Sequence, residues 1–95
     1  MRDEYTFVPN VYVDEHLAEL SGAETKVLLA IIRRTFGEQK DSDEISIEQL
    51  QQMTVLARNS VRSGLRGLLE RGLIAQTKSA EGIRPTSYKC VIPRD

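Results

Sequence analysis

The sequence predicts one winged helix-turn-helix domain over residues 1–95, mainly helical with a small β-hairpin. Three observations support this fold class. Two segments open with capping boxes and continue with apolar residues at three- and four-residue spacing. A short turn joins the second segment to another amphipathic helix, as in a helix-turn-helix. Two short alternating segments follow, and a chain of this length can build one hydrophobic core but not two.

Two helices are predicted in the N-terminal part. A turn at Pro9 leads into a short helix over about residues 11–19, and Val13, Leu17 and Leu20 share its apolar face. The next helix begins at a capping box, and we expect a glycine with positive φ to end it. The residues concerned are Ser21 and Glu24 at the start and Gly37 at the end.

The helix-turn-helix is predicted between residues 45 and 74. Residues 38–44 are wholly polar and predict a surface loop, and Ile45 is placed in a very short strand. A second capping box opens a short helix, a turn around Leu56 follows, and a longer helix covers about residues 58–71. The residues that define these helices are Ser46 and Gln49 in the box, Ile47, Leu50 and Met53 on the inner face of the short helix, and Gly72 after the long one.

A hairpin completes the predicted fold, and one core joins the elements. Residues 73–77 and 86–92 are the predicted strands, with a turn at residues 79–82. Leu56 is expected to fill the space between the two helices of the helix-turn-helix. The predicted core consists of Val27, Leu28, Ile31, Ile32, Leu50, Leu56, Val61, Leu65, Leu68 and Ile74.

Charge is distributed unevenly along the chain. Residues 1–54 contain eleven acidic and five basic residues, a net charge of −6, whereas residues 55–95 contain eight basic and three acidic residues, a net charge of +5. Such a chain can present a basic face to phosphates although its total charge is −1. Ordinary solvated surface charge is the alternative, and charge alone does not decide between the two.

The second helix of the helix-turn-helix carries the residues that indicate DNA contact. Arginine matches guanine edges and phosphates, and asparagine pairs with adenine. The alternative is that these side chains form only the solvated face of an amphipathic helix. Because the positive face follows a helix-turn-helix and precedes a hairpin, we favour DNA contact. The uncovered face contains Arg58, Asn59, Arg62, Ser63 and Arg66, with no carboxylate in the helix before Glu70.

The hairpin adds further basic residues. Lys78 and Arg84 are expected to reach neighbouring phosphates or a minor groove. For Lys89, phosphate contact and ordinary exposed strand charge remain equally good interpretations. The hairpin is therefore predicted to support DNA binding, and the helix to read the sequence.

The sequence resembles the N-terminal domain of the phage replication protein O family over about 70 residues. The matching segments are FVPN at 7–10, LSGAE at 20–24, VLLAIIRRTFG at 27–37, Ile45-Ser46, Val61 and LLERGLI at 68–74. The chain departs from the family at Glu38, where Trp is frequent, and at Val55 and Ala57, where Gly and Ser are usual. The resemblance implies a domain that binds repeated sites in a replication origin, with helicase recruitment through a separate C-terminal domain.

No pattern in the sequence is typical of an enzyme. It has no phosphate-binding loop, and one histidine and one cysteine cannot build a zinc site. His16 is expected on a helix surface and Cys90 in the core. Gly64 and Gly67 each cost a helix about 1 kcal/mol relative to Ala. Close approach of another helix or of DNA backbone would explain them, and plain tolerance of glycine is the alternative. We expect neither catalysis nor a cofactor.

The sequence thus predicts a sequence-specific binder of double-stranded DNA, in replication initiation or transcriptional control of a phage or mobile element. The alternative is a protein-interaction module or inhibitor that docks a basic partner through its acidic N-terminal half, above all residues 41–44. A homodimer is expected, at least on DNA, with the two N-terminal helices as its surface. A cytoplasmic location without membrane contact is expected, because the chain lacks an apolar leader and any apolar run of about 20 residues.

Overall fold

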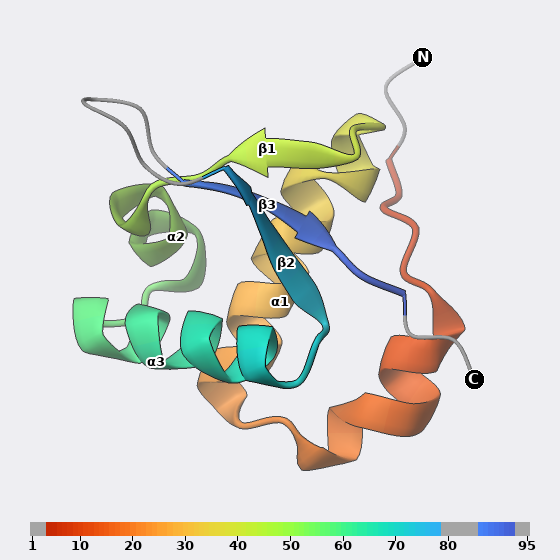
Figure 1. Ribbon diagram of the computed structural model, residues 1–95, viewed down its shortest axis with the longest axis horizontal. Coiled ribbons are helices and arrows are strands. Elements are labelled where there is room, and N and C mark those ends of the chain that lie inside the picture. The colour runs from red at the N-terminus through yellow and green to blue at the C-terminus, as the bar shows by residue number, and fades with distance from the viewer. Residues whose placement is uncertain (1–3, 79–85, 93–95) are drawn as a thin grey trace.

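The computed structural model describes residues 4–78 and 86–92. The elements in chain order are the π-helical turn η1 (Tyr12–His16), the 3-10 turn η2 (Leu17–Glu19), α1 (Gly22–Arg34), the 3-10 turn η3 (Phe36–Glu38), β1 (Ser42–Glu44), α2 (Ile47–Thr54), α3 (Arg58–Glu70), β2 (Ile74–Lys78) and β3 (Ser87–Cys90) (Figure 1). The chain is mainly helical with a small antiparallel sheet, an arrangement compatible with the winged helix-turn-helix that the sequence predicts. None of the helices in these ranges has the length and apolar character required to span a bilayer.

Both predicted capping boxes are present. The Ser21 hydroxyl accepts a hydrogen bond from the Glu24 backbone N–H (3.1 Å), and the Glu24 carboxylate accepts one from the Ser21 N–H (2.8 Å). Ser46 and Gln49 exchange the same pair of bonds at 3.0 and 2.9 Å. Each box satisfies two backbone donors that the helix itself leaves unpaired. The starts of α1 and α2 are therefore confirmed.

The end of α1 differs from the prediction. The helix ends at Arg34, and the chain continues into the η3 turn, so the residue with positive φ is Gln39 (58°) and not Gly37. The Thr35 carbonyl accepts hydrogen bonds from the N–H groups of Glu38 (3.0 Å) and Lys40 (2.8 Å). The turn thus delays the change of backbone direction by two residues.

The N-terminal helix buries a different side chain from those predicted. Tyr12 is buried, and its hydroxyl donates a hydrogen bond to the Val91 carbonyl (2.6 Å) beyond the end of β3. Val13 and Leu17, by contrast, are 53% and 43% exposed. Residues 12–16 form a π-helix and the next three a 3-10 turn, so the 3.6-residue spacing behind the prediction does not hold there.

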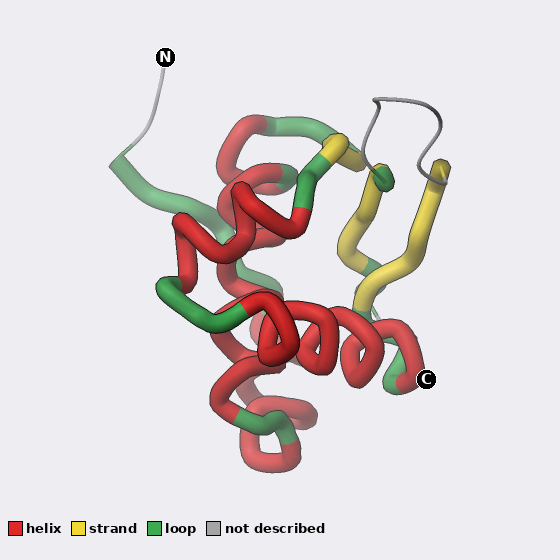
Figure 2. Tube along the Cα trace, turned by 90° about the vertical axis from the view of Figure 1, so that its left-hand side faces the viewer, coloured by secondary structure: helices red, strands yellow, loops and turns green. Residues whose placement is uncertain are grey.

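The sheet has three strands in the order β1-β3-β2 (Figure 1), all antiparallel. The strands lie together at one side of the helices (Figure 2). The predicted loop at residues 38–44 is wrong over its last three residues, because Ser42–Glu44 pairs with β3. Ile45 follows this strand and does not belong to it, although its N–H donates to the Thr86 carbonyl (3.0 Å). β2 and β3 lie within one to two residues of the predicted strands, and the predicted turn at 79–82 lies outside the described residues.

The predicted core is confirmed except at Leu56. Leu56 is only partly buried against the core, and Met53, predicted on an inner face, is 42% exposed because it lies in the last turn of α2. Cys90 is a core residue as expected, and burial raises the pKa of its thiol. The buried apolar side chains that the prediction missed are Tyr12, Ala30, Ile45, Leu73 and Tyr88.

α3 packs closely on the start of α1 at two glycines. A Cβ atom at Gly64 would lie 3.1 Å from the Ala23 carbonyl oxygen, and one at Gly67 would lie 1.8 Å from Glu24 Oε2. The Glu24 carboxylate also accepts a hydrogen bond from Arg71 Nε (3.4 Å), just past the end of α3. Close approach of the α1 backbone therefore explains Gly64, and Gly67 leaves room for the Glu24 side chain.

Gly67→Ala is expected to lower the free energy of unfolding by about 1–3 kcal/mol, although Ala is the better helix former. The new methyl group would occupy the space of the Glu24 carboxylate, so that carboxylate must shift and weaken the capping box or the contact with Arg71. Urea denaturation measures the change. Gly22→Ala is the control, because a Cβ there meets no atom within 4 Å. Equal stabilisation of both variants would contradict the close approach.

Acid is expected to lower the free energy of unfolding, because the Glu24 carboxylate becomes protonated. The Ser21 backbone N–H, and then Arg71, hold the pKa of the Glu24 carboxyl below its ordinary value of 4.5. The folded state favours the ionised form, so this stabilisation is complete above the ordinary pKa and is lost as the pH falls through the lowered one. Thermal unfolding followed from neutral to acidic pH should show a shallower acid decline for Glu24→Gln. An unchanged decline would contradict the assignment.

Candidate nucleic-acid interface

The turn of the helix-turn-helix is held by backbone and threonine hydrogen bonds. Val55 adopts the left-handed conformation (φ 58°) and donates its N–H to the Gln51 carbonyl (2.8 Å), which ends α2. The Leu56 N–H then donates to Thr54 Oγ1 (3.3 Å). Leu56 packs against the core, whereas the Val55 side chain is 86% exposed. The turn thus places the start of α3 beside the end of α2.

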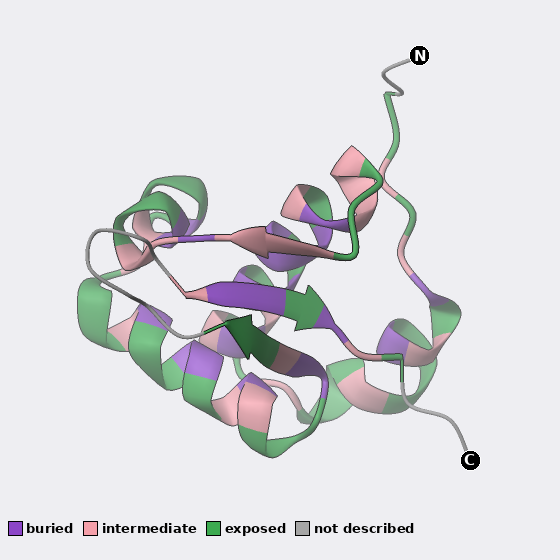
Figure 3. Cartoon of the chain, turned by 45° about the horizontal axis from the view of Figure 1, so that its top comes forward, coloured by how far each residue is buried: buried purple, intermediate pink, exposed green. Residues whose placement is uncertain are grey.

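α3 separates its apolar and polar residues onto two faces. Val61, Leu65 and Leu68 are buried, and exposed stretches alternate with buried ones along the helix (Figure 3). The five residues of α3 that are predicted to contact DNA are all exposed: Arg58, Asn59, Arg62, Ser63 and Arg66. The structure thus brings these five side chains together on the outer side of one helix.

A carboxylate that the sequence did not associate with α3 lies beside its first turn. Glu48 of α2 forms an ion pair with Arg58 (2.9 Å), and this hydrogen bond lowers the pKa of the Glu48 carboxyl. Because Glu48 lies ten residues before Arg58, in the preceding helix, the residue pattern of α3 alone does not reveal it. Among the described residues, no ion pair involves Arg62 or Arg66. The charge of Arg62 still acts on the Glu48 carboxyl and helps to lower its pKa, so Arg66 carries the least compensated of these positive charges on α3.

The basic residues of the hairpin are only partly placed. Lys78 is exposed at the end of β2, and Lys89 is exposed on the central strand β3. The last residue of β2 and the first turn of α3 lie toward the same side of the molecule (Figure 1). Arg84 lies outside the described residues.

The acidic segment at residues 41–44 is less available than the sequence suggests. Asp43 lies in β1 and forms ion pairs with Arg34 (2.7 Å) and Lys40 (3.2 Å). Its side chain is 13% exposed. Asp41 remains exposed. Because Asp43 is paired, however, the segment presents less negative charge than its composition suggests.

Val55→Gly is expected to raise the free energy of unfolding by about 1 kcal/mol, because a side chain in the left-handed conformation is strained and glycine relieves the strain. The exposed Val55 side chain buries little surface that the change would lose. Chemical denaturation tests this, with Val55→Ala as the comparison that removes the branched side chain but keeps a Cβ. Destabilisation by the glycine would show that the left-handed turn is not strained.

Comparison with known families matches almost the whole chain. A sequence model of the family described as bacteriophage replication protein O matches residues 1–88. No curated protein and no solved structure shows significant similarity to the chain. The chain belongs to the bacteriophage replication protein O family, which associates it with phage replication.

Proposed function

We propose that this member of the bacteriophage replication protein O family binds double-stranded DNA sequence-specifically, with α3 in the major groove and without catalysis of its own. The main support for the proposal is the exposed outer face of α3, where neither Arg62 nor Arg66 forms an ion pair among the described residues. These two side chains are four residues apart, about 6 Å along the helix axis. That spacing is close to two base-pair steps, so both guanidinium groups can address neighbouring base edges.

The start of α3 supports contact with the DNA backbone. Ala57 occupies the N-cap position with extended backbone (ψ 157°), and its side chain makes no capping hydrogen bond. The first backbone N–H groups of the helix therefore lack the acceptor that Ser or Asn would supply. A phosphate oxygen can take that place, where the helix dipole also favours negative charge.

The remaining predicted residues take supporting roles in the proposal. Asn59 lies one turn before Ser63 on the exposed face and provides a bidentate partner for adenine. Lys78 and Arg84 hold neighbouring phosphates, as does Arg58 if Glu48 releases it. Replication initiation is the preferred process because of the family, and transcriptional control is the second.

A protein-interaction module remains the competing function. In that interpretation the acidic N-terminal half docks a basic partner, and the α3 arginines are only solvated. The ion pairs of Asp43 speak against it, because they neutralise a carboxylate at the centre of the predicted acidic surface.

Residues that contact bases and residues that contact phosphates should respond differently to substitution. Arg62→Ala or Arg66→Ala should weaken binding to the preferred duplex by about 1–3 kcal/mol and flatten the preference among sequences. Lys78→Ala and Arg84→Ala should weaken binding to all duplexes similarly and reduce the salt slope by about one phosphate contact each. Binding site selection from a random pool, followed by titrations at two salt concentrations, measures both.

Asp41→Asn is the control, because this exposed carboxylate lies outside the proposed interface. If the arginine variants bind duplex DNA as the wild type does, while the control variant loses function in cells, the protein-interaction alternative replaces this proposal.

A further inference from the structure

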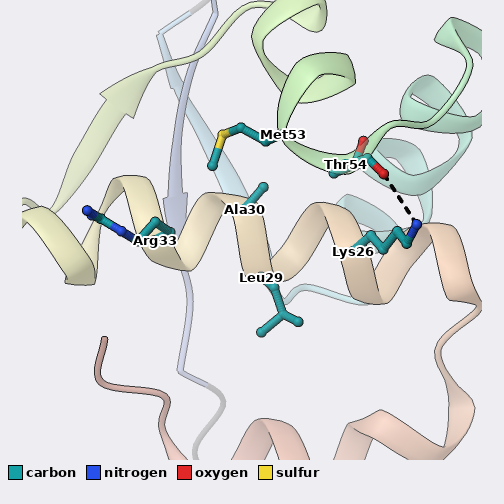
Figure 4. Close-up of a pocket in the computed structure, with 6 residues that line it drawn as sticks. All are labelled: Lys26, Leu29, Ala30, Arg33, Met53 and Thr54. Atoms are coloured by element: carbon teal, nitrogen blue, oxygen red, sulfur yellow. Dashed lines mark hydrogen bonds between the residues drawn. The ribbon is translucent and has the colours of Figure 1, made fainter. Parts of the chain in front are cut away.

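A groove between α1 and α2 is separate from the outer face of α3. Its volume is about 340 Å³. Ala30 of α1 and Met53 of α2 face each other across it, and Leu29 projects from the outer side of α1 (Figure 4). Met53 and Leu29 are 42% and 51% exposed, so the groove and its rim offer apolar surface to a partner. The residues that line the groove are Lys26, Leu29, Ala30, Arg33, Met53 and Thr54.

Two basic side chains mark the ends of this groove. Lys26 and Arg33 are seven residues apart on α1, about 10 Å along its axis. Lys26 Nζ donates a hydrogen bond to the neutral Thr54 carbonyl (3.3 Å), so its positive charge is not cancelled. Arg33 is paired with Glu38, but its side chain remains 48% exposed. The groove therefore combines an apolar centre with an uncompensated positive charge at Lys26. At its other end, a partner carboxylate would have to share Arg33 with Glu38 or take its place.

We propose that this groove docks an amphipathic helix of a partner protein, with an apolar side chain between two carboxylates spaced by two helical turns. The apolar side chain covers Met53 and Ala30, and the carboxylates pair with Lys26 and Arg33. Helices that place an apolar face in such grooves are a recurrent mode of recognition, and the flanking charges fix their register.

Two other occupants fit the groove less well. A second copy related by a two-fold axis through Leu29 would place Lys26 of each copy near Arg33 of the other, and these like charges repel one another. Single-stranded nucleic acid normally stacks its bases on aromatic side chains, and the six lining residues include none. An acidic amphipathic helix meets neither objection.

The experiment uses a fluorescent synthetic helical peptide with leucines between two glutamates spaced by two turns. Wild-type protein should bind it about three- to tenfold more tightly than the same peptide with glutamine in place of glutamate. Lys26→Glu combined with Arg33→Glu should abolish that preference and instead favour a peptide with lysine at the two positions. Lys78→Glu combined with Lys89→Glu is the matched control, since it changes the net charge equally on the sheet.

Backbone amide shifts of the wild-type protein identify the surface without any variant. The acidic peptide should move the resonances of Ala30 and Met53 and leave those of Arg62 and Arg66 unchanged. Equal affinity for the glutamate and glutamine peptides, or shifts on α3 instead, would overturn the proposal. Preferential binding of a single-stranded oligonucleotide in the groove would equally overturn it. Duplex binding by α3 is measured separately, so failure of the groove proposal and failure of the DNA-binding proposal can be distinguished.

Discussion

The Glu24 carboxylate occupies the space where α1 and α3 cross, and the rest of the structure depends on that crossing. It completes the capping box of α1, accepts a hydrogen bond from Arg71, and fills the position that a side chain at residue 67 would take. The same crossing brings Gly64 against the backbone of Ala23. The close contact between the two helices thus offsets the loss of helix propensity at the two glycines. The crossing fixes which side of α3 faces the core, and therefore which side faces outward.

Electrostatic pairing separates the structure into compensated and uncompensated regions. In the N-terminal half, Asp43 joins Arg34 and Lys40, and Glu24 joins Arg71. These pairs hold β1 to α1 and the end of α3 to the start of α1. On α3 the pairing stops after Arg58, so the positive charge that follows faces solvent. A net charge of −1 for the chain is therefore compatible with a locally basic helix.

Local patterns predicted much of this fold, because they depend on residues a few positions apart. The capping boxes and the 3.6-residue spacing of Val61, Leu65 and Leu68 gave the helices and the exposed arginine face. β1 escaped prediction, because Ser42–Glu44 is wholly polar and is held by backbone pairing with a strand some 45 residues later. The burial of Tyr12 and the ion pair of Glu48 with Arg58 escaped it for the same reason, since both depend on partners in other elements.

We propose that the crossing of α1 and α3 presents the middle of α3 to duplex DNA. Titration of isotopically labelled protein with a short duplex, followed by backbone amide and arginine side-chain resonances, tests it most directly. We expect the largest shifts to fall on Asn59, Arg62, Ser63 and Arg66, and to diminish as the salt concentration is raised. Shifts concentrated on Leu29, Ala30 and Met53, with the α3 arginines unaffected, would contradict it.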